Sequence, residues 1–239
     1  MKKNNFLGIN AGKASATLCL LVTTTFTQAQ MNVAYPRDVS VSASTQAFDA
    51  KQTFKKVIGM LDLKHAKAGV SLYTTVIGTP GIPKVNVATL PKAEGSSVLE
   101  QNRNLSRFLQ KGLADFEELD QPATHKRTEI FRSLVVLTDH FEPGANRTLL
   151  IIESDFISSG YVAEFFKYSN NPSGLMDDFE KIIEEFKKDN GGILPDLTGY
   201  EVVLVSSAGD NELALWSTRW WKRAMLHFGA KEVKVKAAL

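Results

Sequence analysis

Side chains that bear hydroxyl or carboxylate groups follow three predicted strands of this 239-residue sequence. The strand ends lie at residues 75–81, 154–158 and 206–211. Ligands of a parallel sheet bind beyond the carboxyl ends of its strands, where the connecting loops converge. We therefore expect one ligand-binding rim, formed by Thr79, Thr128, Ser154, Asp155, Ser206, Ser207 and Asp210. Two roles stay open for Asp155: a functional ligand, or an N-cap whose carboxylate accepts backbone N–H groups at a helix start.

Residue types that support catalysis do not form a recognisable site. The four histidines are His65, His125, His140 and His227. They make no pair at helical spacing, so zinc or iron ligation is unsupported. No Gly-x-Ser-x-Gly turn presents a nucleophilic serine, and a Ser-His-Asp triad whose members meet only in the folded chain stays open. The sequence therefore contains no motif that indicates an enzyme.

The first 29 residues have the pattern of a cleavable secretory signal peptide. Lys2 and Lys3 give a basic start, residues 14–26 are mostly small or apolar, and cleavage is expected after Ala29. A transmembrane anchor is one alternative, but this run is shorter than the roughly 20 apolar residues that span a bilayer. Acylation of Cys19, the sole cysteine, in a lipoprotein is another. We expect an exported protein, periplasmic or secreted, without stable membrane insertion.

Composition limits the partners and the chemistry of the exported chain. Loss of Lys2, Lys3 and Lys13, with no acidic residue before the expected cut, lowers the formal charge by three, from +2 to −1. A near-neutral domain lacks the basic surface that binds nucleic acid or an anionic membrane. About 200 residues are enough to bury one substantial core. Without cysteine, neither a disulfide framework nor thiolate chemistry is available.

The elements that must position the rim alternate between strands and amphipathic helices. Residues 30–46 are small, polar and without apolar periodicity, which indicates a flexible leader before a single α/β domain at 47–239. Ser97 and Glu100 have capping-box spacing at the start of the longest predicted helix. The predicted helices cover 48–63, 97–119, 128–140, 175–188 and 211–228, and the predicted strands cover 69–77, 82–90, 148–154, 200–206 and 233–235.

The order of these elements predicts the fold class. Unbroken apolar strands that are separated by helices are typical of a mainly parallel sheet with helices on both faces. The first two strands are joined by a short turn around 78–81 and add an antiparallel edge hairpin. We therefore predict a Rossmann-like α/β fold.

Three segments, in this order, resemble the von Willebrand factor A-like domain, which has this Rossmann-type fold. They are the strand at 70–77, the threonine-led helix start Thr128-Glu-Ile-Phe-Arg-Ser-Leu134, and the strand end Leu150-Ile-Ile-Glu-Ser-Asp155. The helix that contains Trp220-Trp221, followed by Gly229-Ala230 and a short last strand, is similar to many bacterial members. The resemblance covers residues 68–239. It implies that strand 150–154 is central and lies next to strand 70–77.

The resemblance also implies where a divalent cation would bind. Members of the family use an Asp-x-Ser-x-Ser loop after the first strand, a threonine from a second loop and an aspartate from a third, and such oxygen ligands suit Mg²⁺. Thr128 and Asp155 occupy the second and third positions. The first loop is expected at 75–81, where Thr79 is a weak candidate ligand, and Phe156 replaces the family's glycine. We therefore expect a degenerate metal site and no cofactor, with Mg²⁺ as the alternative.

These observations favour a binding function. We expect an exported binding module that recognises a protein partner through the loop rim without a complete metal site. One alternative is an exported hydrolase whose site assembles around Asp155, and another is a purely structural envelope component. Trp216 and Trp221, with Arg219 nearby, have two interpretations: a partner surface, because tryptophan and arginine are enriched at binding hot spots, or core packing.

Overall fold

The computed structural model describes residues 30–40, 42–43, 48–61, 63, 69–78, 83–120, 127–160, 163–206 and 209–239. The expected signal peptide at 1–29 and the rim candidates Thr79 and Ser207 lie outside these residues. Within them, no helix combines the length and the apolar character that crossing a membrane requires.

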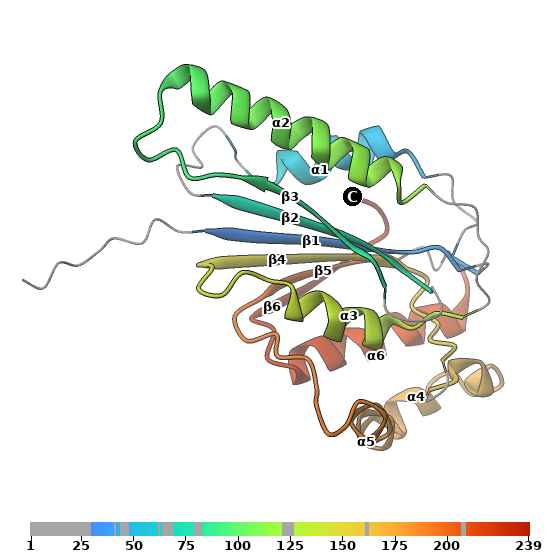
Figure 1. Ribbon diagram of the computed structural model, residues 1–239. Coiled ribbons are helices and arrows are strands. Elements are labelled where there is room, and N and C mark those ends of the chain that lie inside the picture. The colour runs from blue at the N-terminus through green and yellow to red at the C-terminus, as the bar shows by residue number, and fades with distance from the viewer. Residues whose placement is uncertain are drawn as a thin grey trace, which may run out of the picture.

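In this part of the chain, six strands form one mixed sheet in the order β3-β2-β1-β4-β5-β6 (Figure 1). They are β1 (Met31–Asp38), β2 (Val70–Ile77), β3 (Val85–Leu90), β4 (Arg147–Ser154), β5 (Glu201–Ser206) and β6 (Glu232–Lys236). All neighbouring strands run parallel except the edge pair β2 and β3, which is antiparallel. The predicted Rossmann-like α/β class, with its antiparallel edge hairpin, is confirmed.

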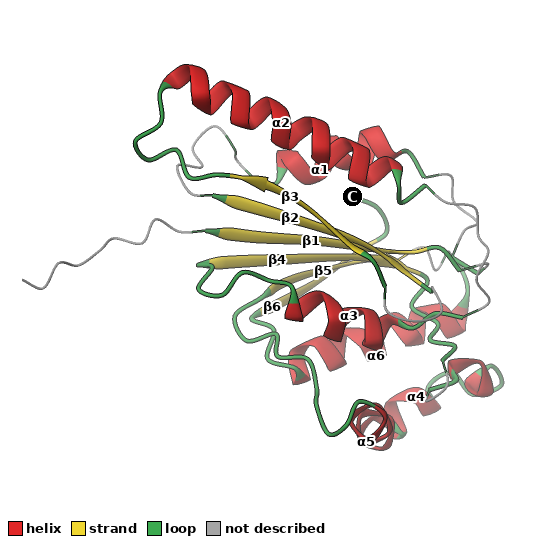
Figure 2. Ribbon diagram, in the orientation of Figure 1, coloured by secondary structure: helices red, strands yellow, loops and turns green. Residues whose placement is uncertain are grey.

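Helices cover both faces of the sheet (Figure 2). One face carries α1 (Ala50–Gly59) and α2 (Val98–Glu117), and the other carries α3 (Ile130–Asp139), η1 (Phe165–Tyr168), α4 (Gly174–Asp177), α5 (Phe179–Asp189) and α6 (Glu212–His227). Each face has its own core: Val33 and Ile151 pack with α1 and α2, whereas Ala34 and Ile152 belong to the core of the opposite face. Successive residues of a strand point to opposite faces, so β1 and β4 are buried on both sides.

Polar caps start two of the helices at the positions that the sequence predicts. Ser97 Oγ accepts the backbone N–H of Glu100 at 3.2 Å at the start of α2. Asn211 Oδ1 accepts the N–H of Ala214 at 3.1 Å, so Asn211 caps α6. Each cap satisfies a backbone donor that the helix itself leaves free, which stabilises the helix by about 1 kcal/mol.

The expectation of a flexible leader at 30–46 is wrong, because residues 31–38 form β1 at the centre of the sheet. All eight residues of β1 are buried. Asn32 Nδ2 donates to the Glu142 carbonyl at 3.0 Å, and Arg37 Nη1 donates to the Leu119 carbonyl at 2.7 Å. These polar residues are buried through partners 110 and 82 positions away in the sequence, so their burial cannot be predicted from the local sequence.

β1 also changes which strands are neighbours. β4 is in the interior of the sheet as predicted, but β1 separates it from β2, so the expected contact between β2 and β4 is wrong. Pro36 is compatible with the position of β1 in the interior of the sheet. The register of β1 with β4 pairs residues 31–34 and Arg37 but is interrupted at Tyr35 and Pro36, where proline lacks the N–H that a ladder needs.

The tryptophans of α6 are mainly core residues. Trp220 and Trp221 are fully buried and pack edge to face, with ring centroids 5.1 Å apart. Of the two interpretations of Trp221, core packing is therefore the one that the structure shows, because Phe186 of α5 adds a further layer, its ring centroid 5.9 Å from that of Trp221. Trp216 is half-buried, and the Arg219 guanidinium lies 4.6 Å from the centroid of its ring.

Candidate metal centre

Asp38, the last residue of β1, lies at the centre of a buried hydrogen-bond cluster and is only 3% exposed. Its Oδ1 accepts the backbone N–H of Ser40 at 2.8 Å, and its Oδ2 accepts the Ser154 hydroxyl at 2.6 Å. The hydroxyl oxygens of Ser40 and Ser42 are 3.3 Å apart. The loop after β1 thus brings together one carboxylate and two hydroxyls, and Ser154 fixes the carboxylate to the end of β4.

Asp155 directly follows β4 and contacts the same loop. It is 4% exposed, its Oδ1 accepts the Ile157 N–H at 2.9 Å, and its carboxylate also accepts a hydrogen bond from the Ser42 hydroxyl. The bond to Ile157 closes a local turn two residues long. The next described helical residue is Phe165, so the alternative of a helix N-cap at Asp155 is wrong.

Phe156 stands where the resemblance implies glycine, and its backbone keeps a conformation that favours glycine. Its φ is 63°, a left-handed value that costs an L-residue about 1–2 kcal/mol. Two contacts hold it in place: Ser154 Oγ accepts the Phe156 N–H at 2.9 Å, and the ring is fully buried. The loop after β4 therefore keeps its shape although the glycine is absent.

Thr128 comes from the loop before α3 and is fully buried. The loop after β4 holds its backbone: the Thr128 N–H donates to Ser159 Oγ at 3.1 Å, and its carbonyl accepts the Ser159 N–H at 3.3 Å and the Ser158 hydroxyl at 3.4 Å. Its own Oγ1, by contrast, has no hydrogen-bond partner among the described residues. A buried hydroxyl without a partner costs about 1–3 kcal/mol, so this oxygen is available to a ligand.

The two buried carboxylates make the free site electrostatically unfavourable. Burial raises the pKa of Asp38 to about 6, and the negative charge of Asp155 adds to the rise, whereas hydrogen bonds from Ser154 and Ser40 oppose it. Burial also raises the pKa of Asp155, against the hydrogen bonds from Ile157 and Ser42. Neither carboxylate is paired with a cationic side chain that the structure describes. A divalent cation between these loops would lower both pKa values.

The donor set fits a hard divalent cation. Two carboxylates, of Asp38 and Asp155, and three hydroxyls, of Ser40, Ser42 and Thr128, are the oxygen ligands that Mg²⁺ prefers. No group of three or more His, Cys, Asp and Glu side chains among the described residues is placed to hold a metal, so the hydroxyls are necessary to any site here. These five residues also complete the Asp-x-Ser-x-Ser, threonine and aspartate pattern that the resemblance implies.

The placement of the first loop at residues 75–81 is therefore wrong. It followed from taking residues 70–77 as the first strand. The first strand is β1, and the loop after it reads Asp38-Val-Ser-Val-Ser42, a motif present in the sequence but assigned to the leader. Thr79 lies outside the described residues, and Thr75 Oγ1 donates to the Lys84 carbonyl at 2.9 Å in the β2–β3 hairpin. Sequence reasoning thus missed three of the five ligand candidates.

The remaining rim candidates fall into two groups. Ser154 belongs to the candidate metal centre, where it holds the first-loop carboxylate. Ser206, its register partner on β5, places its hydroxyl oxygen 3.0 Å from that of Thr218 in α6. Asp210 is exposed just before α6, and Ser207 lies outside the described residues. The structure thus divides the expected rim between the metal centre and the region around β5.

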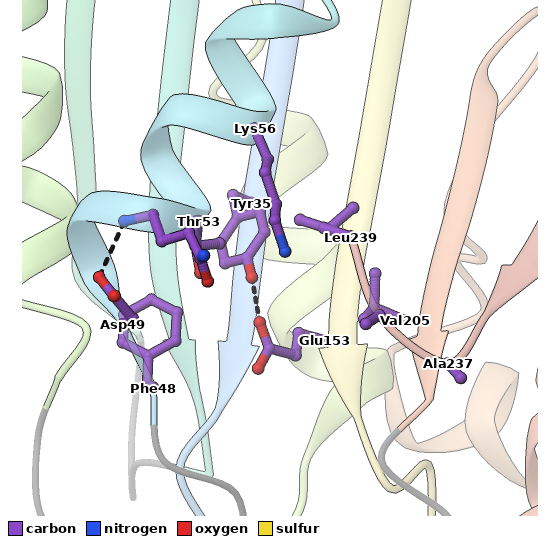
Figure 3. A pocket seen from close by; sticks show the side chains of 11 residues that line it. Tyr35, Phe48, Asp49, Thr53, Lys56, Glu153, Val205, Ala237 and Leu239 are labelled. Carbon is purple, nitrogen blue, oxygen red and sulfur yellow. Dashed lines mark hydrogen bonds between the residues drawn. The ribbon is translucent and has the colours of Figure 1, made fainter.

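A pocket of about 140 Å³ on the α1 face shows how β1 is anchored (Figure 3). The Tyr35 hydroxyl donates to the Glu153 carboxylate of β4, and burial raises the pKa of this hydroxyl far above its ordinary value. Arg37 Nε lies 3.8 Å from the Glu153 carboxylate, and the Arg37 guanidinium lies 3.9 Å from the centroid of the Phe48 ring. These contacts fix the residue before Asp38, so we interpret the pocket as structural support.

Comparisons with known proteins show little beyond this geometry. No protein-family model matches the chain, and no curated protein matches it. The crystal structure of the human COPII-coat protein Sec24c is similar over 89% of this chain and 30% of that chain, with a TM-score of 0.39 and 11% identity. The chain therefore spans less than a third of that protein. Fold and site define a Rossmann-like α/β protein with a candidate cation centre at the carboxyl ends of its central strands.

Proposed function

We propose that this chain is a von Willebrand A-like binding module that holds a divalent cation, preferably Mg²⁺, and recognises a carboxylate-bearing protein partner. The strand order, the antiparallel edge hairpin and the three converging loops support the family assignment. Export to the periplasm or to the medium is part of the proposal and rests on the signal-like sequence at 1–29 alone.

The observation that carries the proposal is the unpartnered Thr128 hydroxyl in the loop cluster that buries two carboxylates. Folded proteins pair their buried polar and charged groups, because an unpaired group costs free energy. A divalent cation held by Asp38 and Asp155 is the partner that we propose for the Thr128 hydroxyl. Without it, burial raises the pKa of both carboxylates, because no cationic side chain that the structure describes offsets their desolvation.

The residues around the site define what it can recognise. Ser42 is the exposed member of the set, so the site opens to solvent at this residue. When bound there, a divalent cation supplies a coordination position for an oxygen atom from outside the chain. A carboxylate is the protein group that best matches such a cation in charge and in ligand type.

A hydrolase is the second candidate, because Asp155 has a serine, Ser42, within hydrogen-bond reach. Serine catalysis also needs a base, which is most often histidine. The two described histidines, His140 and His227, end α3 and α6, whose first residues lie at the rim. Helices of 10 and 16 residues are roughly 15 and 24 Å long, so both histidines lie at the far end of the sheet. Ser42-dependent hydrolysis of p-nitrophenyl acetate would reverse this preference for binding.

Calorimetric titration of Mg²⁺ and Mn²⁺ into the chain from Gln30 onward tests the cation site. Binding by the wild type that is lost in Asp155→Asn supports the proposal. Asp210→Asn is the matched control, because it removes an equal charge from the rim outside the site, and it should bind as the wild type does. A wild-type chain that binds neither cation contradicts the proposal.

A further inference from the structure

A groove lies next to the candidate metal centre. It has a volume of about 420 Å³ and opens between α6 and β6, beyond the end of β5. Leu215, Val235 and Ala237 form its apolar part, and Leu215 and Val235 are 45% and 46% exposed. Because ligand cavities for small molecules enclose most of the ligand, apolar residues this exposed indicate a surface groove for a macromolecule.

Positive charge surrounds this apolar floor. Arg219, Lys222 and Lys236 line the groove, and no acidic residue is among its described lining residues. The neighbouring cations Arg223 and Lys234 each pair with a glutamate. The three groove cations form no ion pair within the described part of the chain, so their charge is available to a ligand.

The groove is close enough to the candidate metal centre for one ligand to reach both. Ser206 lines the groove and is the register partner of Ser154, which holds Asp38. Adjacent strands are about 4.8 Å apart, so the step from β4 to β6 is roughly 10 Å. About three extended residues cover this distance.

We propose that the groove binds the segment of the partner protein that follows its metal-bound carboxylate, and that this segment carries apolar and acidic side chains. The inference rests on the proposed function for the carboxylate anchor. Apolar side chains of the segment cover Leu215 and Val235, and its carboxylates face the three groove cations, because complementary charge fixes register and excludes basic partners. Arg219 is held over the Trp216 ring and is therefore preorganised for this contact.

Fluorescence anisotropy of a labelled peptide, Asp-Gly-Ser-Gly-Leu-Leu-Glu-Glu, tests the inference in MgCl₂ and in EDTA. The double variant Arg219→Glu/Lys222→Glu is expected to bind it roughly tenfold more weakly in both solutions. A twin peptide with serine for leucine and glutamine for glutamate should bind the wild type more weakly by a similar factor. The matched control is Lys181→Glu/Lys188→Glu on exposed positions of α5, which has the same change in charge and should bind as the wild type does.

The outcomes separate this inference from the proposed function. If the groove variant binds the peptide as tightly as the α5 control, the inference is wrong, even where binding depends on Mg²⁺. If binding depends on the groove but neither on Mg²⁺ nor on Asp155, the groove assignment stands and the metal-dependent function fails. Tighter binding of oleate than of the peptide, lost in the same groove variant, would assign the groove to an acyl chain and overturn the inference.

Discussion

Ser154 and Ser206 occupy equivalent places at the ends of neighbouring strands, but they act differently. Ser154 donates to Asp38 and accepts the Phe156 N–H, so it shapes the loops of a candidate ligand site. Ser206 pairs with Thr218 and ties β5 to α6. The two serines thus have equivalent positions in the sheet, but the neighbouring elements determine whether the hydroxyl contributes to a ligand site or to packing.

The largest effect is expected from Asp38→Asn. Loss of this carboxylate should lower the affinity for Mg²⁺ by more than about 100-fold, or roughly 3 kcal/mol. In EDTA at neutral pH, the variant should be at least as stable as the wild type, because it removes a buried charge whose pKa is raised. Calorimetry and thermal unfolding measure the two effects. Wild-type affinity in this variant would remove Asp38 from the site.

Thr128→Val should weaken Mg²⁺ binding by roughly tenfold to 100-fold. In EDTA the variant should be at least as stable as the wild type, by up to about 1–3 kcal/mol more, because valine has the same shape and removes a buried hydroxyl that has no partner in the described structure. Urea unfolding checks the second point. A loss of more than about 2 kcal/mol in EDTA would show that the hydroxyl has a structural partner instead.

The pH dependence should differ between binding and stability. Protons and Mg²⁺ compete for Asp38, so affinity should fall by up to about tenfold per unit as the pH drops below the pKa of about 6. In EDTA, the stability of the fold should change with pH in the opposite direction to the Mg²⁺ affinity. The pKa of Asp38 is about 6 in the folded state, above the ordinary 3.8, so this group stabilises the fold at a pH below 3.8. This stabilisation, on the order of 3 kcal/mol, is lost as the pH rises through 6.

Urea unfolding in EDTA across this pH range measures that loss. Asp38→Asn is the control, because it removes the group that titrates and should flatten the profile. A wild-type profile that is already flat between about pH 4 and 7 would contradict the raised pKa.

The smallest effects sharpen the comparison of the two serines. Ser154→Ala and Ser206→Ala should each cost about 1 kcal/mol of stability, since each removes a hydrogen bond. Only Ser154→Ala should also weaken Mg²⁺ binding, by roughly tenfold, because groups that orient metal ligands affect affinity. Parallel calorimetry of the two variants is the measurement. Equal Mg²⁺ affinities would mean that both serines are purely structural.

The parts of the site that sequence reasoning found depend on local patterns. β4 is an unbroken apolar run, and α2 begins at a serine with capping-box spacing. Thr128 and Asp155 follow from the family resemblance, which rests on a helix start and a strand end that are recognisable locally. These features require no knowledge of distant residues, so the sequence alone was enough to predict them.

The parts that were missed depend on the rest of the fold. Asn32 and Arg37 are polar residues in a buried strand, and their partners lie in other elements. Because that strand was not predicted, Asp38 and the two serines after it could not be placed at a strand end, although the motif is present in the sequence. The role of Trp221 stayed open for a similar reason, because the helical pattern of α6 gives no sign of the α5 layer that covers this side chain.

The central position of β1 has a consequence for the order of folding. Met31 pairs with Val70 on one side and with Arg147 on the other, so β1 leaves the ribosome before either of its partners. Pairing over such sequence separations is slow, because loop-closure entropy is lost before the contacts stabilise the chain. The loop that carries Asp38 can therefore take its shape only after β4 has joined the sheet. The rate at which Mg²⁺ binding appears during refolding would therefore report how fast the sheet is completed.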